Sequence, residues 1–296
     1  MNDRKLKIAV VGAGKAGAAH GAAFCACGRA EVVRVVSRTR ESARRLAEAL
    51  PGASYGTDLD EALEDPRVDA LVVASPDALH HPQTLAALKK GKHVLVEKPM
   101  ALNVAECEEM VNEARRTGLK LMVGHICRFY PFFEQVKAWA EDGTLGTPYY
   151  VETSYIHNYE SIPGVGGWRY DPEKRHPFVG GACHAVDLAR WLGGDIEEVH
   201  AYGNHFNIPQ QKWEDHIIAN VKFKNGVVGR IMNSSGCPRP YNIECEVWGT
   251  EGALCGDNTR DVAQLAQRTT GYKKWLTYPK ETMAKAIANE IGHFVD

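Results

Sequence analysis

KIAVVGAGKAG, residues 7–17, is the stretch that decides the fold. Its first five residues are mostly apolar and β-branched, and they predict a buried strand. Glycines in the pattern G-x-G-x-x-G then open a helix: Gly12 permits the tight turn, Gly14 lets the backbone approach a pyrophosphate, and Gly17 lets helix and strand pack closely. Because a helix N-terminus presents N–H groups to phosphate, we expect a dinucleotide site. Its residues are Gly12, Ala13, Gly14, Lys15, Ala16 and Gly17.

The first 125 residues alternate strand-like and helical patterns. The expected strands are residues 7–11, 32–37, 70–74, 93–97 and 119–124. The expected helices are residues 16–27, 41–49, 78–90 and 104–117. Such alternation, with nearly continuous apolar strands, is typical of a parallel sheet with right-handed crossovers. We therefore predict an α/β fold that begins with a doubly wound Rossmann domain over residues 1–125.

The pattern changes after residue 125. Helices are expected at residues 132–140 and 182–192, and strands at 215–223, 227–234, 242–249 and 253–255. Asn225-Gly226, between the first two of these strands, is a strong signal for a type I′ hairpin turn. We predict a second, α+β domain over residues 126–296, with an open, mostly antiparallel sheet. Because the strand around 242–248 is apolar on both faces, we expect a homo-oligomer to cover one of them.

Composition excludes several classes of protein. The 296 residues suggest two domains, and a formal net charge of −2 argues against binding nucleic acid through a general basic field. No apolar run approaches the roughly 18 residues of a membrane-spanning helix, and the start leaves no room for a signal peptide. The eight cysteines have neither zinc-site spacing nor the density of a disulfide scaffold. We expect a cytoplasmic protein without a metal, a membrane partner or a nucleic-acid partner.

The choice of cofactor is expected to depend on the end of the second strand, about 20 residues past the glycines. An NAD site usually carries Asp or Glu there, but this chain reads Ser37-Arg38-Thr39-Arg40. A hydroxyl beside a guanidinium suits a 2′-phosphate, so Ser37 and Arg38 favour NADP, with NAD as the alternative. The simpler interpretation is that both arginines are solvated charges at the start of a helix.

Residues 93–99, HVLVEKP, predict a strand that ends at a proline. Glu97 and Lys98 then lie at the carboxyl edge of the parallel sheet, where open α/β folds bind ligands. A lysine there can donate to a substrate hydroxyl and stabilise a developing alkoxide. Taken alone, such a lysine is more often a surface charge.

Several motifs together resemble the glucose–fructose oxidoreductase, inositol dehydrogenase and rhizopine-catabolism family, Gfo/Idh/MocA. Besides the glycine loop they are Ser75-Pro76-Asp77-Ala78-Leu79-His80, Gly91-Lys92-His93-Val94 before Glu97-Lys98-Pro99, Arg128-Phe129-Tyr130-Pro131, Gly143-Thr144-Leu145-Gly146 and His184-Ala185-Val186-Asp187. The resemblance implies a Rossmann domain followed by a domain whose open sheet often forms the oligomer interface. It also implies oxidation or reduction of sugars, polyols or their derivatives with NAD(P).

The resemblance assigns roles to residues. Lys98 and His184 match the family's catalytic lysine and histidine, and Asp187 shares a helix face with His184, where it could orient the ring. Cofactor contacts are implied for Ser75, Pro76, His80, Glu97, Lys98, His125, Trp168 and Arg169. Substrate contacts are implied for Lys98, Arg128, Tyr155, His157 and His184. We expect His184 to take the hydroxyl proton as hydride leaves, while Lys98 polarises the oxygen.

The chain departs from the family pattern in further places. Many members carry Asp four residues before the histidine, where this chain has Gly180; Asp187 or His176 is the expected substitute. Many members also continue past the point where this chain ends, so we expect a short member or a fragment. Two other functions fit the same motifs. One is glycoside cleavage through transient sugar oxidation, with an extra base from residues 155–160; the other is dinucleotide sensing without catalysis, which would need neither Lys98 nor His184.

Overall fold

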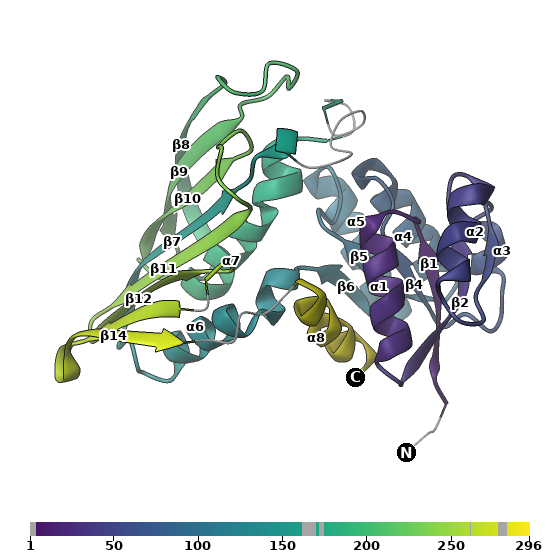
Figure 1. The fold of residues 1–296 in the computed structure, drawn as a ribbon, viewed down its shortest axis with the longest axis horizontal. Helices are drawn as coiled ribbons and strands as arrows, with labels where there is room; N and C mark the ends of the chain where they lie inside the picture. Colours follow the sequence, from purple (N-terminus) through teal and green to yellow (C-terminus); the bar gives the residue numbers. More distant parts are fainter. Residues whose placement is uncertain (1–3, 162–169, 172–174, 261, 278–282) are drawn as a thin grey trace. The chain divides into compact units, whose positions relative to one another are not determined.

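A computed structural model of the chain describes residues 4–161, 170–171, 175–260, 262–277 and 283–296 (Figure 1). By its internal contacts the chain divides into two compact units. The first comprises Met1–Ile126 together with Ala284–Asp296, and the second comprises Cys127–Met283. Each unit has its own sheet.

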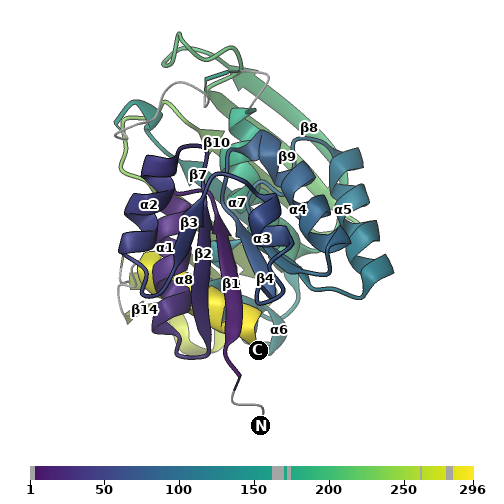
Figure 2. The ribbon, with the colours of Figure 1, turned by 90° about the vertical axis from the view of Figure 1, so that its right-hand side faces the viewer.

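The first unit is built on a six-stranded parallel sheet with the order β3-β2-β1-β4-β5-β6. Figure 2 labels β3, β2, β1 and β4 of this sheet. Its strands are β1 Leu6–Val11, β2 Ala30–Val36, β3 Ser54–Gly56, β4 Ala70–Val73, β5 His93–Glu97 and β6 Leu121–Gly124. Its helices before the second unit are α1 Lys15–Ala26, α2 Arg40–Glu48, α3 Asp60–Leu63, α4 His80–Lys89 and α5 Val104–Thr117. The predicted doubly wound fold is confirmed. The strand order reverses between β1 and β4, at the switch point where such sheets bind ligands.

Both faces of this sheet are covered, because alternate residues of a strand point to opposite sides. Val10 of β1 packs in the same core as Phe24 of α1. Its neighbour Val11 packs on the other side with Leu88 of α4 and Met110 of α5. This double burial explains why β1 has an uninterrupted apolar sequence rather than an alternating one.

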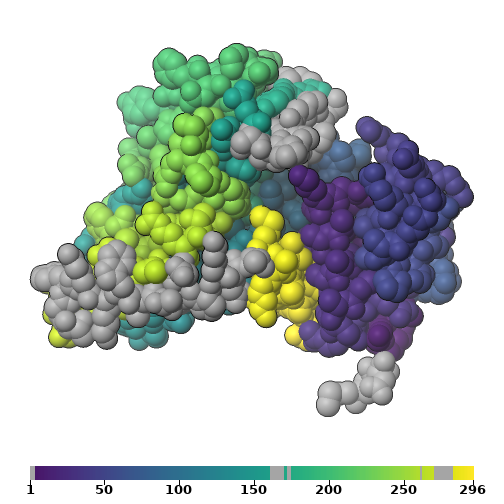
Figure 3. Space-filling model, in the orientation of Figure 1, coloured from purple at the N-terminus to yellow at the C-terminus, as the bar shows by residue number. Residues whose placement is uncertain are grey.

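The last helix, α8 Met283–Val295, packs in the first unit although it follows the second unit in sequence. Ile291 lies in the same core as α1, and the Phe294 ring meets Phe24 edge-on at 6.0 Å between centroids. Figure 3 shows the yellow α8 directly against the purple residues of α1. The sequence assigned residues 126–296 to the second domain. An amphipathic pattern shows that a helix has a buried face but does not show which core buries it.

The second unit holds an eight-stranded sheet with the order β14-β13-β12-β11-β7-β10-β9-β8. Its strands are β7 Pro148–Ile156, β8 Ile196–Asn204, β9 His216–Phe223, β10 Val228–Ser234, β11 Asn242–Gly249, β12 Gly252–Asp257, β13 Val262–Gln267 and β14 Gly271–Thr277. β7 and β10 pair in parallel, whereas the other described pairs are antiparallel, so the predicted mostly antiparallel sheet is confirmed. Its longer helices are α6 Pro131–Glu141 and α7 Cys183–Gly193, the latter preceded by a π-helical segment, Phe178–Ala182.

The hairpin between β9 and β10 exists, but the predicted type I′ turn is wrong. A type I′ turn needs positive φ at both central residues, whereas Gly226 has φ of 88° and Asn225 does not have a positive φ. The Phe223 N–H instead donates to the Val227 carbonyl at 2.8 Å, which closes a longer loop. The same Asn-Gly dipeptide also fits a longer loop in which only the glycine is in the left-handed region, so the dipeptide alone did not determine the turn type.

The glycine loop yields a prediction about stability. A Cβ on Gly17 would lie 1.9 Å from the Gly12 carbonyl oxygen, so Gly17→Ala should lower the free energy of unfolding by about 3 kcal/mol or more. Gly14→Ala is the matched control, because a Cβ there meets nothing within 4 Å. It should change stability by less than about 0.5 kcal/mol while weakening dinucleotide binding. Urea unfolding and cofactor titration measure both effects, and equal unfolding free energies for the two variants would contradict the packing argument.

Candidate active site

The glycine loop has the geometry of a pyrophosphate cradle. Gly12 has φ of 106°, and a Cβ there would lie 2.4 Å from the Ala74 carbonyl oxygen. Gly14 precedes the first turn of α1, which contains no acidic residue and no side-chain cap. Since the space around the Gly14 α-carbon is open, the N–H groups at the start of α1 can meet a phosphate. The residues present therefore fit the dinucleotide that the sequence predicts.

The end of β2 carries hydroxyls and an exposed guanidinium. Thr39 caps α2 by accepting from the Ser42 N–H at 3.3 Å, and the Ser42 hydroxyl donates to Ser37 at 2.9 Å. Arg40 is occupied elsewhere, since its guanidinium lies 5.2 Å from the centre of the Tyr55 ring. Arg38 is exposed. Of the two arginines, Arg38 is therefore the one better placed to meet a group bound beside Ser37.

A buried histidine ties together the loops that follow β4 and β5. His80 lies at the start of α4, with Nδ1 2.7 Å from the Pro99 carbonyl oxygen and Nε2 2.9 Å from that of Ser75. The Ser75 hydroxyl donates to Gln83 at 2.6 Å. His80 was predicted as a cofactor contact. Its two nitrogens lie against the main chain, so its part is to hold the Ser75 and Pro99 segments at the carboxyl edge of the sheet.

Glu97 accepts two hydrogen bonds at the end of β5. Its Oε2 accepts from the Lys98 N–H at 3.0 Å, and its Oε1 lies 2.7 Å from Nε2 of the buried His20. Burial raises the pKa of Glu97, but the hydrogen bond and charge of His20, with the charge of Lys98, outweigh it and lower the pKa to about 2. Glu97 is therefore ionised at neutral pH. Sequence reasoning missed His20, although a histidine on an alanine-rich helix one turn past the glycines was the available signal.

An aromatic and histidine cluster forms in the second unit. The His184 ring, at the start of α7, stacks on Tyr155 with centroids 5.9 Å apart. The Tyr155 hydroxyl lies 3.1 Å from Nδ1 of His157. Tyr241 meets both Tyr155 and His157 edge-on, and Tyr159 meets His157. The structure thus brings three predicted residues together with Tyr159, from the 155–160 segment proposed as the source of an extra base. It adds Tyr241, which sequence reasoning did not select.

The position of the family's carboxylate is taken by an arginine. A Cβ on Gly180 would lie 2.3 Å from the guanidinium carbon of Arg175, whose Nη2 donates to the Gly180 carbonyl at 2.6 Å. His176, one of the two expected substitutes, packs its ring on Trp213 at 4.6 Å, and burial lowers its pKa. The sequence could not show this arrangement, because nothing in the spacing of Gly180 points to a guanidinium.

Two predicted residues pair with each other. Both oxygens of Asp187, the other expected substitute, accept from Arg128, at 2.8 and 2.7 Å. The Arg128 guanidinium also lies 5.4 Å from the centre of the Trp191 ring. Such a bidentate pair is strong and geometrically specific. Asp187, predicted to orient His184, therefore directs its carboxylate to Arg128.

The other predicted residues are placed as follows. Pro76 precedes the short helix η1 Asp77–Leu79, and His125 follows β6, its N–H donating to the Val123 carbonyl at 2.7 Å. Trp168 and Arg169 lie outside the residues that the structure describes. Lys98 belongs to the first unit and His184 to the second.

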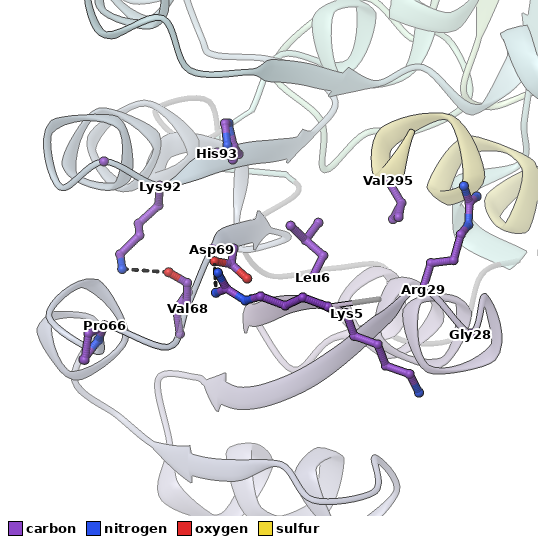
Figure 4. A pocket seen from close by; sticks show the side chains of 12 residues that line it. Lys5, Leu6, Gly28, Arg29, Pro66, Val68, Asp69, Lys92, His93 and Val295 are labelled. Carbon is purple, nitrogen blue, oxygen red and sulfur yellow. Dashed lines mark hydrogen bonds and ion pairs between the residues drawn. The ribbon is translucent and has the colours of Figure 1, made fainter. Parts of the chain in front are cut away.

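A separate depression of about 940 Å³ lies in the first unit (Figure 4). It is lined by residues at the amino ends of β1, β4 and β5, including Leu6, Asp69 and His93. Its Lys92 donates to the Val68 carbonyl at 2.7 Å. Because strands in a parallel sheet run the same way, this depression is at the edge opposite to Gly12 and cannot serve the glycine loop.

Two family models match the chain. Residues 6–125 match the oxidoreductase family with an NAD-binding Rossmann fold, and residues 133–255 match the GFO/IDH/MocA C-terminal domain. Among the described residues, no helix has both the length and the apolar character needed to cross a bilayer.

Individual proteins match over most of the chain. Myo-inositol 2-dehydrogenase of Thermotoga maritima is 29% identical, over 98% of this chain and 87% of its own length. 1,5-Anhydro-D-fructose reductase of Ensifer adhaerens is 31% identical, over 77% of this chain and 68% of its own length. Among solved structures, GenD2 from gentamicin A biosynthesis in complex with NAD has a TM-score of 0.86 at 28% identity, covering 99% of this chain and 85% of that one.

Proposed function

This chain belongs to the Gfo/Idh/MocA oxidoreductase family, and from that premise we propose that it transfers hydride between NAD(P) and a hydroxyl or keto carbon of a sugar, polyol or sugar derivative. The observation that carries the proposal is the pairing of a phosphate-binding glycine loop with Lys98 at the carboxyl edge of the same sheet. The relatives named as an inositol dehydrogenase and an anhydrofructose reductase support the substrate class.

In the proposed mechanism Lys98 and His184 act on the same substrate oxygen. Bound NAD(P) supplies the hydride acceptor for oxidation or the hydride donor for reduction. A neutral His184 takes the proton of the reacting hydroxyl, and Lys98 donates a hydrogen bond to the oxygen as negative charge develops there. Tyr155 keeps its proton, since burial raises its pKa well above the ordinary value, and its hydroxyl is suited to orient a polyol.

The proposal predicts a loss of turnover without a matching loss of cofactor binding. Lys98→Met and His184→Ala should each lower kcat by about 10²–10⁴-fold, the usual value of acid–base assistance, while the Kd of NAD(P) changes little. Lys89→Met and His293→Ala, at exposed positions, are the matched controls. The assay follows nicotinamide absorbance with a panel of sugars and polyols that includes myo-inositol. Full activity of either catalytic variant would show that its residue is not in the proton path.

For the cofactor we propose a preference for NADP over NAD, supported by Ser37 and the exposed Arg38 where NAD sites carry a carboxylate. Arg38→Ala should weaken NADP binding by about 1.5–3 kcal/mol, the value of a lost charge-assisted hydrogen bond, and leave NAD binding nearly unchanged. Arg40→Ala is the control, because Arg40 packs over Tyr55. Titration of both cofactors into each protein measures the difference. Tighter binding of NAD than of NADP by the unaltered protein would overturn the proposal.

We further propose that the face of the second sheet away from α7 forms a homo-oligomer interface. Tyr202 and Val228 lie on that face and are 72% and 50% exposed, and large exposed apolar patches are uncommon on monomers. The protein should therefore sediment as a dimer or larger at micromolar concentration, and Tyr202→Glu should shift it toward the monomer. A monomeric unaltered protein would rule out this interface.

A further inference from the structure

We propose that His20 is a positioning residue. It holds the Glu97 carboxylate against the Lys98 main chain and so fixes the backbone position from which the Lys98 side chain extends. The inference rests on the proposed function, because it gives His20 a task only if Lys98 acts on substrate. The inference assigns a part in the proposed function to a residue of α1, the helix that follows the glycine loop.

The contacts form a continuous path within the first unit. His20 is 1% exposed, and its Nε2 lies 2.7 Å from Oε1 of Glu97. An ionised carboxylate only accepts hydrogen bonds, so Nε2 carries the proton and donates it. The other oxygen, Oε2, accepts from the Lys98 N–H at 3.0 Å. One carboxylate therefore connects α1 to the residue that carries the amine, and both of its oxygens are engaged.

A second carboxylate lies on the far side of the ring. Oε2 of Glu290, in α8, is 4.0 Å from Nδ1 of His20, which is beyond hydrogen-bond distance but within electrostatic reach. Burial lowers the pKa of His20, yet the bond and charge of Glu97 with the charge of Glu290 raise it above the ordinary value. Burial raises the pKa of Glu290 itself to about 7. The groups that face His20 thus favour its charged form, which holds Glu97 more strongly than a neutral ring would.

A purely structural role would not need this arrangement. The neighbours of His20 along α1 are alanines and glycines, and an apolar residue could fill the same interior without the cost of desolvating charges. What an apolar residue could not do is engage Oε1 of Glu97 and keep Oε2 turned toward the Lys98 N–H. A positioning role and a purely structural role therefore predict different strengths for the hydrogen bond that the Lys98 N–H donates to Glu97.

The test compares two polar replacements of the same residue. In His20→Gln the side-chain amide reaches the place of Nε2 and can still donate to Glu97, whereas in His20→Asn it reaches only the place of Nδ1. His81→Gln is the matched control, because His81 makes an equivalent pair with Glu109, 2.9 Å long, at the surface. Amide hydrogen exchange at Lys98, measured by NMR on the protein without ligands, should be about tenfold faster in His20→Asn, the value of one hydrogen bond. It should stay near the unaltered rate in His20→Gln and His81→Gln.

The second measurement is turnover of myo-inositol and 1,5-anhydro-D-fructose with NAD(P). His20→Asn should lower kcat by about tenfold or more with the KM for NAD(P) within about threefold, and His20→Gln should recover most of kcat. Unchanged exchange at Lys98 in His20→Asn would overturn the inference, whatever happens to turnover. If Lys98→Met is fully active, the proposed role of Lys98 fails, and with it the premise of the inference; if the unaltered protein turns over no sugar or polyol, the proposed function fails instead. If Lys98→Met is inactive while His20→Asn keeps its kcat, only the role of His20 fails.

Discussion

The close approach of backbones at the glycine loop is the constraint on which the first unit depends. A Cβ on Gly17 would collide with the Gly12 carbonyl, and one on Gly12 would collide with that of Ala74. With glycine at both places, α1 can start directly after β1 and lie close to β4. The same packing carries His20, one turn into α1, to Glu97 at the end of β5. The phosphate cradle and the support beneath Lys98 therefore arise from one tight contact.

Buried polar groups are stabilised differently in the two units. In the first, the imidazole of His20 lies between two carboxylates, Glu97 and Glu290. In the second, burial raises the pKa of Tyr155 and Tyr241 well above the ordinary value, so both hydroxyls stay neutral. Neutral hydroxyls both donate and accept hydrogen bonds, which matches the hydroxyl groups of a sugar or polyol. The glycine loop of the first unit suits a phosphate, and the neutral tyrosines of the second unit suit the polyhydroxy compound proposed as substrate.

Local sequence signals were sufficient to predict a helix or strand whose ends are set by its own neighbouring residues. The predicted helix 104–117 coincides with α5, because Asn103 caps its first turn and Gly118, with φ of 70°, ends it. The predicted strand 93–97 coincides with β5. The shorter β3 and α3 were not predicted, since three or four residues do not establish a period.

The sequence by itself determined the doubly wound sheet, the glycine loop and the end of β5 at Lys98, because each depends on neighbours along the chain. Tyr155, His157 and His184 were selected through the family resemblance, and Tyr241 joined them only in the structure. Tertiary structure alone decided that α8 returns to the first unit, that Asp187 binds Arg128 and that Arg175 lies against Gly180. It also decided that His20 meets Glu97 across 77 residues of chain. Such pairings join segments that are far apart in the chain and close together only in the folded structure. Residue spacing along the sequence therefore suggested a different contact in some cases and no contact in the others.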